Sequence, residues 1–145
     1  MNINHGKYLG VDYGDVRTGI AECDISGMLA SGITTLKEGG MKNTAKRVAE
    51  EAEKRSCKKI IIGLPKNMDG TEGDRVGVIK AFAELLSGFT DIEIDFYDER
   101  MSTMVAYRYL GATETYGKKR RASVDTLSAE IILQGYIDRE RNEKK

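Results

Sequence analysis

The chain has 145 residues, of which 40% are hydrophobic and 32% charged, and its 23 basic side chains balance 23 acidic ones. This length and composition suit one globular domain over residues 1–145 and exclude a largely disordered chain. No apolar run approaches the roughly 20 residues that cross a bilayer, and the first ten residues lack the apolar core of a secretion signal. We therefore expect a cytoplasmic protein that does not enter a membrane.

The cysteines and the charge distribution limit which ligands the chain can hold. Cys23 and Cys57 lie far apart and neither has a CxxC partner, which predicts buried, reduced thiols rather than metal ligands. Zero net charge argues against non-specific coating of nucleic acid, but the cations are unevenly distributed. Four of them are consecutive within the segment GKKRRAS at 117–123.

The first part of the chain predicts three strands joined by short turns, at 7–12, 18–23 and 28–36. In the first strand, alternation places Asp12 on the same face as Tyr8 and Gly10. Consecutive strands with short connections form an antiparallel meander.

The periodicity then changes to helical spacing, which predicts a helix over 43–56 with Asn43 as its N-cap. The run Ile60–Ile62 is typical of a strand buried on both faces, and Pro65 ends it. A glycine-rich loop over 66–74 follows.

The remaining elements continue this alternation. A helix is predicted over 75–88, followed by a strand over 91–97 whose Glu93, Asp95 and Tyr97 face outward near a sheet edge. A short helix over 102–111 and a longer one over 123–140 complete the chain, with a frayed tail at about 139–145. The order predicts an α/β fold: a mixed sheet with helices on both faces.

Acidic residues fall at the ends of several predicted elements. Asp12 ends the first strand, Asp98 and Glu99 follow the fifth, and Asp125 lies in the first turn of the last helix. Each alone is explained by turn chemistry or by a helix dipole. Together they fit a second explanation, because open α/β folds bind ligands at one edge of the sheet and divalent cations need oxygen ligands.

Four segments resemble the YqgF family, within the RNase H-like, Holliday-junction-resolvase-like superfamily. They are GVDYGDVRTGIA (10–21), IIIGLPKNMDGTEGDR (60–75), DERMST (98–103) and VDTLSAEIILQGYID (124–138). The resemblance implies an RNase H-like five-stranded sheet of order 3-2-1-4-5, with strand 2 antiparallel and helices on both faces. It also implies a cytoplasmic nuclease that matures the 5′ end of the 16S ribosomal RNA precursor.

Carried onto this sequence, the resemblance implies an acidic triad of Asp12, Glu99 and Asp125. These carboxylates would hold two Mg²⁺ or Mn²⁺ ions, with Asp12 bridging them, for phosphodiester hydrolysis. Whether Asp98 replaces Glu99 as a ligand stays open at this point.

The candidate substrate contacts are cationic or amide side chains near these acids. For Arg17, pairing with a nearby acid is an equal alternative, and for the basic run the alternative is a solvated loop. The candidates are Arg17, Asn67, Arg75, Lys118, Lys119, Arg120 and Arg121.

Two departures from the junction resolvases keep other functions open. Ser128 stands where those enzymes carry a fourth carboxylate, and the fourth strand has IIIG where they place an acid. The leading hypothesis is a metal-dependent nuclease acting on RNA rather than DNA, in ribosomal precursor particles, as a monomer or homodimer. The alternatives are a Holliday junction resolvase and a non-catalytic RNA-binding factor in ribosome assembly or transcription.

Overall fold

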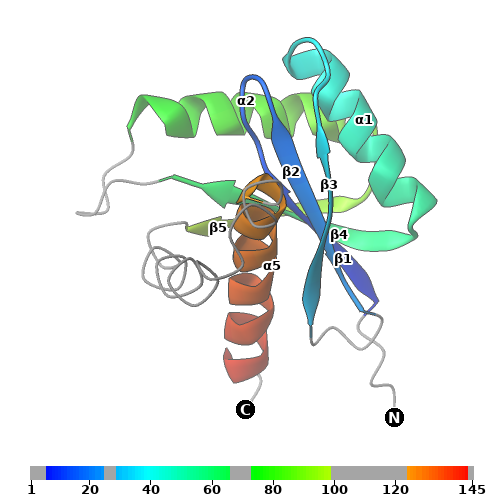
Figure 1. The fold of residues 1–145 in the computed structure, drawn as a ribbon, viewed down its shortest axis with the longest axis vertical. Helices are drawn as coiled ribbons and strands as arrows, with labels where there is room; N and C mark the ends of the chain where they lie inside the picture. The colour runs from blue at the N-terminus through cyan, green and yellow to red at the C-terminus, as the bar shows by residue number, and fades with distance from the viewer. Residues whose placement is uncertain (1–5, 25–28, 66–72, 99–123, 144–145) are drawn as a thin grey trace.

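The computed structural model describes residues 6–24, 29–65, 73–98 and 124–143 (Figure 1). Five strands form one sheet in the order β3-β2-β1-β4-β5, which confirms the predicted order. β2 is antiparallel to both of its neighbours, whereas β1, β4 and β5 run parallel. The strands are β1 (Lys7–Asp12), β2 (Thr18–Cys23), β3 (Ala30–Leu36), β4 (Cys57–Leu64) and β5 (Glu93–Asp98).

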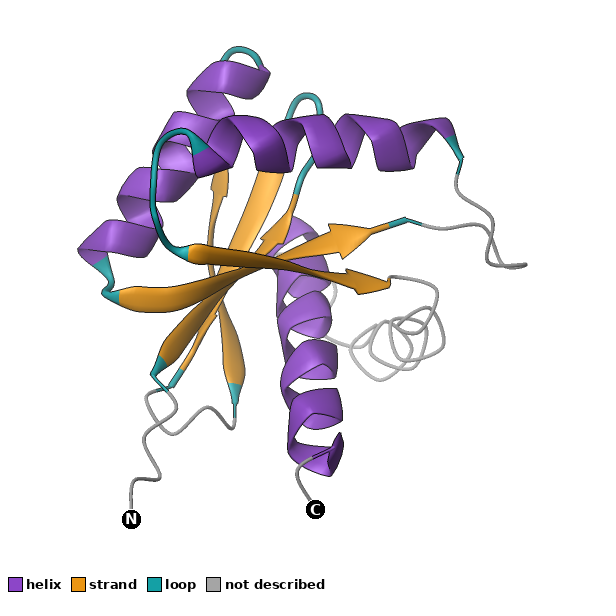
Figure 2. Ribbon diagram, turned by 180° about the vertical axis from the view of Figure 1, so that it is seen from behind, coloured by secondary structure: helices purple, strands orange, loops and turns teal. Residues whose placement is uncertain are grey.

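Helices cover both faces of the sheet, as predicted. α1 (Met41–Lys54) and α2 (Asp74–Ser87) lie together on one face, and α5 (Val124–Glu143) crosses the other (Figures 1 and 2). α5 continues to Glu143 and so includes residues expected to belong to a frayed tail. Within the described ranges, no helix combines the length and the apolar character needed to cross a membrane.

The face covered by α1 and α2 is packed mainly with aliphatic side chains. Ile60 and Ile62 of β4 point into this core, whereas Ile61 points to the opposite face. The middle of β4 is therefore buried on both sides, as its continuous apolar run predicted. The predicted apolar stripe of α2 is buried in the same core: Val76, Ile79, Phe82, Ala83 and Leu86.

The face covered by α5 is packed differently, and here one prediction was wrong. Tyr97 was expected to face outward, but it is only 6% exposed. Its ring fills the space where a side chain at Gly135 of α5 would stand. Strand alternation correctly separated Tyr97 from Phe96, but it could not reveal that the last helix covers the tyrosine's face.

The start of α1 also differs from the prediction. The helix begins at Met41, with Gly40 rather than Asn43 as its N-cap residue. Gly40 has φ +87°, a conformation that glycine adopts without strain. The Asn43 side chain donates to the Gly39 carbonyl oxygen at 2.7 Å, so it contacts the chain preceding the helix.

Both cysteines are buried and free, as the sequence predicted. The backbone N–H of Tyr8 donates to the Cys23 sulfur at 3.1 Å. Burial raises the pKa of Cys23, and it raises the pKa of Cys57 to about 12. Both thiols are therefore protonated, unreactive parts of the core at neutral pH.

Candidate active site

Asp12 is the last residue of β1, a strand inside the sheet with β2 on one side and β4 on the other. Leu9 and Val11 belong to the core under α1 and α2, whereas Tyr8 belongs to the core under α5. By the two-residue alternation of a strand, Asp12 lies on the α5 face, where it is half-buried. The predicted central position of this carboxylate at a strand's carboxyl end agrees with the fold.

α5 approaches β1 so closely that only glycine fits at position 10. A Cβ there would lie 2.7 Å from the Cβ of Leu133 and 2.9 Å from the carbonyl oxygen of Ala129. Further toward the start of β1, the Tyr8 hydroxyl donates to Glu140 at 2.9 Å. The helix therefore runs antiparallel to the strand, with its N-terminal end toward the end of β1.

This arrangement determines which part of α5 lies beside Asp12. Two strand residues advance about 6.6 Å, which corresponds to about four residues of helix. Since Gly10 lies against Ala129 and Leu133, Asp12 falls opposite the first turn of α5. That turn carries Asp125. The fold thus brings the backbone positions of two predicted ligands to the same place.

α5 is also attached to the edge strand β3. The backbone N–H groups of Ala30 and Gly32 donate to the side chains of Gln134 at 2.9 Å and Glu130 at 3.2 Å. A Cβ at Gly32 would lie 2.8 Å from the Cβ of Thr126, close to the helix N-terminus. These contacts hold the first half of α5 against the sheet.

A polar network holds the other half of α5. Lys59 of β4 donates to the Tyr136 hydroxyl at 2.9 Å, and that hydroxyl donates to Asp95 of β5 at 2.7 Å. The Lys59 ammonium also lies 3.5 Å from a Glu140 carboxylate oxygen and 5.2 Å from the centre of the Tyr8 ring. The network joins α5 to the two parallel strands β4 and β5.

The protonation states of this network follow from its surroundings. Burial, together with the hydrogen bond to Glu140, raises the pKa of Tyr8 to about 12. Burial alone would lower the pKa of Lys59, but its hydrogen bond with Tyr136 and the nearby Glu140 charge hold that pKa above its usual range. At neutral pH the tyrosine is therefore neutral and the lysine charged, the states that these contacts require.

Arg75 lies at the start of α2 and contacts the β1–β2 turn. Its guanidinium donates to the Asp15 carboxylate at 3.0 Å and to the Tyr13 carbonyl oxygen at 3.1 Å. The Tyr13 ring is stacked on Phe82 of α2, with 4.4 Å between ring centroids. Arg75, predicted to contact substrate, thus holds the turn that follows Asp12. The other predicted contact in this region, Arg17, is exposed in the same turn.

Asp98 lies on the opposite face of the sheet from Asp12. It pairs with Leu64 of β4, which belongs to the core under α1 and α2. Val11 pairs with Ile62 of β4, so the next residue, Asp12, lies beside Gly63. Gly63 in turn pairs with Tyr97 of β5, which is the residue before Asp98. Asp98 is therefore poorly placed to share a ligand with Asp12.

Several predicted site residues lie outside the described residues: Glu99, Asn67, Lys118, Lys119, Arg120 and Arg121, together with the side chain of Asp125. Among the side chains that are described, no three His, Cys, Asp or Glu groups gather into a metal site. The chemistry of the donors nevertheless fits Mg²⁺ or Mn²⁺, because the positions at Asp12 and Asp125 both carry carboxylates.

Sequence reasoning missed the residues that position α5. Lys59 was read only as part of a strand, and Tyr8, Tyr136 and Asp95 were given no shared role. Their pairing depends on strand order and on the path of the last helix, so no local pattern could reveal it. The available signal was an unusual one: a lysine directly preceding three isoleucines that are buried on both faces.

Comparisons with known proteins agree with this geometry. The family model described as RuvX, Holliday junction resolvase, matches residues 6–139. A Clostridioides difficile protein named "Putative pre-16S rRNA nuclease" is 39% identical over 92% of this chain and 94% of its own length. A protein of the same name from Caldanaerobacter subterraneus subsp. tengcongensis is 38% identical over 94% of this chain and 99% of its own.

Among solved structures, the chain is similar to Thermus thermophilus RuvC in complex with a Holliday junction substrate. The TM-score is 0.60 at 12% identity, covering 94% of this chain and 96% of the other. At this identity the likeness concerns the fold alone. It agrees with the RNase H-like architecture that the sequence implied.

Proposed function

Because the chain belongs to the RuvX family of Holliday junction resolvases, we propose that it is a metal-dependent nuclease that hydrolyses phosphodiester bonds. The observation that carries this proposal is the placement of Asp12 at the carboxyl end of β1, opposite the first turn of α5. The names of its relatives support the 16S ribosomal RNA precursor as the substrate, and we propose maturation of its 5′ end as the role. That role would be performed in the cytoplasm.

The proposed ligands are Asp12, Glu99 and Asp125, which together would hold the two ions. Bound Mg²⁺ or Mn²⁺ would lower the pKa of the attacking water and stabilise the departing oxygen. The protein positions the carboxylates. The contact of α5 with Gly10 holds the first turn of the helix, which carries Asp125, opposite Asp12. Carboxylates gathered in this way repel one another, so the ions also stabilise their ionised forms.

Arg75 has a positioning role in this proposal. Its bond to the Tyr13 carbonyl fixes the backbone immediately after Asp12. The contact also ties the start of α2 to the same turn. Asn67 in that segment, Arg17 in the turn and the basic run Lys118–Arg121 are the proposed phosphate contacts.

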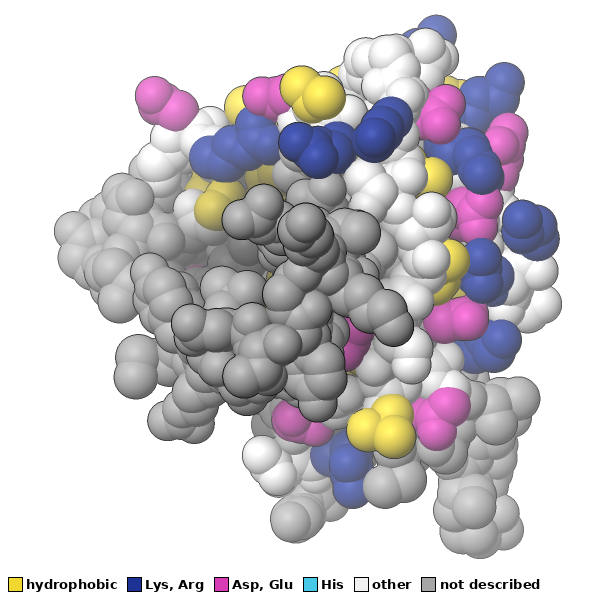
Figure 3. Space-filling model, viewed as in Figure 1, with side chains coloured by type: hydrophobic (Ala, Val, Ile, Leu, Met, Phe, Trp, Pro, Cys, Tyr) yellow, Lys and Arg dark blue, Asp and Glu magenta, His cyan; other side chains and the backbone are white. Residues whose placement is uncertain are grey.

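Basic side chains on the surface support binding of a polyanion. On the face crossed by α5, Lys and Arg side chains form a row along the upper part, whereas over α1 they alternate with Asp and Glu (Figure 3). Phosphate contacts of this kind give affinity without sequence information. The substrate's identity would therefore come from the shape of the RNA and its proteins as well as from these charges.

The second candidate function is resolution of four-way DNA junctions, favoured by the fold shared with a RuvC that was solved with a Holliday junction. Ser128 argues against it, because a junction resolvase of this superfamily is expected to carry a carboxylate there. A non-catalytic RNA-binding factor is the third. These alternatives differ in substrate and in metal dependence, so one assay separates them.

The experiment incubates purified protein with a 16S precursor RNA fragment that spans the 5′ processing site, with a single-stranded RNA and with a four-way DNA junction. Each is tested with Mn²⁺, with Mg²⁺ and with chelator. The expected result is metal-dependent cleavage of the precursor RNA, abolished in Asp12→Asn. Cleavage of the junction alone would favour the resolvase, and no cleavage by the wild type would favour the binding factor.

Asp98→Asn is the matched control, because it removes a carboxylate from the end of β5, the second strand from β1 in the sheet, on the opposite face. We expect this variant to retain most of the wild-type rate. If it loses activity as fully as Asp12→Asn does, the assignment of ligands by sheet face is wrong. Manganese titration of both variants provides a readout that does not depend on turnover.

A further inference from the structure

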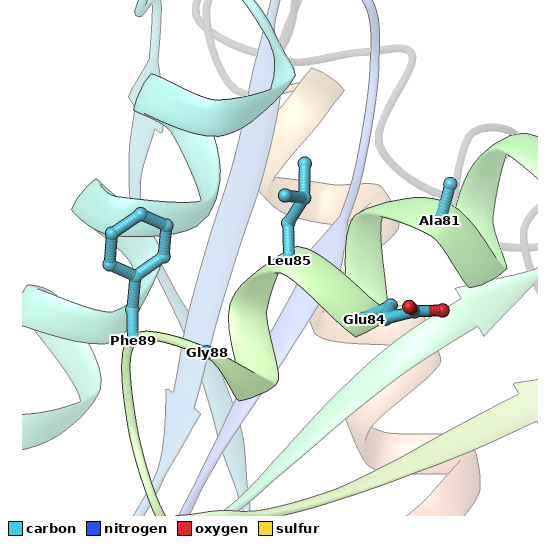
Figure 4. A pocket seen from close by; sticks show the side chains of 5 residues that line it. All are labelled: Ala81, Glu84, Leu85, Gly88 and Phe89. Atoms are coloured by element: carbon cyan, nitrogen blue, oxygen red, sulfur yellow. The ribbon is translucent and has the colours of Figure 1, made fainter.

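The face that carries α1 and α2 has an apolar groove on its outer surface, away from the candidate active site. One hollow of about 460 Å³ is lined by Ala81, Glu84, Leu85, Gly88 and Phe89 (Figure 4). A second of about 420 Å³ is lined by Lys46, Ala49, Glu50, Glu53 and Phe89. Phe89 lines both, so the two hollows lie next to each other, and we call them together the Phe89 groove.

The groove displays large apolar side chains that the core does not use. Leu85 and Phe89 are each 37% exposed, although the neighbouring Phe82 and Leu86 are fully buried. Ala81, Leu85 and Phe89 follow at intervals of four residues and point to the same side (Figure 4). A stripe at this spacing fits the side chains of a helix or extended segment laid along it.

The polar lining of the groove is mainly acidic. Glu84 comes from α2, and Glu50 and Glu53 come from α1, against the single cation Lys46 among the lining residues. Glu53 accepts a hydrogen bond from Thr90, which fixes one carboxylate beside Phe89. The complementary ligand combines bulky apolar side chains with several positive charges.

We propose that the Phe89 groove binds a basic, amphipathic peptide segment of a partner protein. Apolar side chains of that segment would cover Leu85 and Phe89, and its Lys or Arg side chains would pair with Glu50 and Glu84. The charge of the lining disfavours two other occupants. A nucleic acid would meet carboxylates, and a second copy joined through the same patch would place like charges opposite one another.

The location of the groove lets this binding coexist with the proposed catalysis. α1 and α2 cover the face of the sheet opposite α5, and Asp12 lies on the α5 side. A partner could therefore hold the protein while the candidate site stays open. The proposal does not depend on the nuclease activity, and its test measures binding alone.

The test uses fluorescence anisotropy with a labelled synthetic peptide in which leucines at helical spacing are flanked by lysines. Control peptides replace the leucines by serine or the lysines by glutamate. We expect saturable binding of the first peptide to the full chain and binding at least tenfold weaker for both controls. Phe89→Ser should weaken binding about tenfold, with the thermal unfolding curve recorded to establish that the variant is folded.

Glu84→Lys provides a second variant whose fold is not at risk, because this side chain is exposed. It should weaken binding several-fold and reduce its salt dependence. Asp138→Lys makes the same charge change on α5, at the other face, and should leave binding within twofold of wild type. Equal effects of the two charge variants would overturn the proposal, because they would show attraction to overall charge.

The mass of the protein in solution shows whether a second copy of the chain occupies the groove instead of a peptide. Sedimentation should give the same state for wild type and Phe89→Ser. A wild-type dimer that becomes a monomer in Phe89→Ser would overturn the proposal and assign the groove to a second copy. Absence of saturable peptide binding to the wild type would also overturn it.

Discussion

The two faces of the sheet are built from different chemistry. Under α1 and α2, the contacts are mostly between aliphatic side chains, which can change size without losing a specific partner. Under α5, the helix touches glycines at positions 10 and 32 and is joined to β4 and β5 through Lys59 and Tyr136. These contacts specify where along the sheet the helix lies.

Aliphatic contacts mainly stabilise the fold, whereas glycine contacts and hydrogen bonds also determine where the helix lies on the sheet. Burial of aliphatic area stabilises the fold wherever it occurs, because the hydrophobic effect is not directional. A glycine contact or a hydrogen bond is satisfied at one position of the helix only. Position-dependent contacts hold the helix on the face that must bring Asp125 to Asp12, which is the arrangement that a preorganised site requires.

The largest loss of stability is expected on the aliphatic face, from Leu86→Ala. This side chain is fully buried, and its removal leaves a cavity, so the free energy of unfolding should fall by about 2–5 kcal/mol. Denaturant unfolding measures this change. Activity per folded molecule should stay near wild type, and a proportionate loss of both would contradict the separation of the two faces.

Gly10→Ala should lose less stability and more activity. The added methyl group would meet the Leu133 Cβ at 2.7 Å and force α5 away from β1, at a cost of about 1–3 kcal/mol. Because that shift moves the first turn of α5 relative to Asp12, nuclease turnover should fall at least tenfold in the folded protein.

Gly77→Ala is the matched control, since a methyl group there meets nothing within 4 Å and the residue is the fourth of α2. It should stabilise the protein by about 0.5–1 kcal/mol and leave activity unchanged. Full activity in Gly10→Ala would show that the close helix contact does not position the site.

Tyr136→Phe should lower the free energy of unfolding by about as much as Gly10→Ala and by less than Leu86→Ala. It removes one hydroxyl that accepts from Lys59 and donates to Asp95, which costs about 1–3 kcal/mol because both partners are partly buried. Lys59→Met combined with it should cost less than the sum of the two single changes, as residues of one network are coupled. Additive losses in this double-mutant cycle would mean that the groups act separately.

Near neutral pH, titration of Cys57 and Tyr8 should leave stability unchanged, and a pH dependence from these groups is expected only in alkaline solution. The Cys57 thiol ordinarily ionises near pH 9, but burial raises its folded-state pKa to about 12. Between pH 9 and about 12, only the unfolded chain loses this proton. The contribution of the thiol to the free energy of unfolding is therefore complete below pH 9 and is lost as pH rises toward about 12. Tyr8 adds a similar loss from about pH 10.

Chemical denaturation at a series of pH values measures this dependence. Cys57→Ala should remove the part of the decline that begins near pH 9, while the part beginning near pH 10 remains. A decline of identical slope in wild type and Cys57→Ala would contradict the assignment to the thiol.

Much of the fold followed from local pattern, and the exceptions have identifiable causes. The isoleucine run of β4 and the apolar stripe of α2 predicted their burial, since both patterns reflect which faces are covered. Tyr97 was placed outward because alternation distinguishes two faces without showing which of them a distant helix will cover. Asn43 was chosen as a cap because its chemistry suits the role, but Gly40 starts the helix earlier.

The candidate site was only partly accessible from sequence. Asp12 and Asp125 are ordinary residues at element ends, and the family resemblance linked them before the contact at Gly10 gave their proximity a geometric reason. The choice between Asp98 and Glu99 needed the register of β5, which puts Asp98 with Leu64 on the other face. The role of Arg75 needed the turn's conformation, which no spacing rule encodes.

The most direct test of the proposed function is complementation of a strain depleted of its own relative of this protein and defective in 16S maturation. The measurement is the ratio of precursor to mature 16S 5′ ends, by primer extension, with each variant expressed at the wild-type level. The account predicts that the wild type and Asp98→Asn restore mature ends, whereas Asp12→Asn leaves the precursor uncleaved. Full restoration by Asp12→Asn would contradict it.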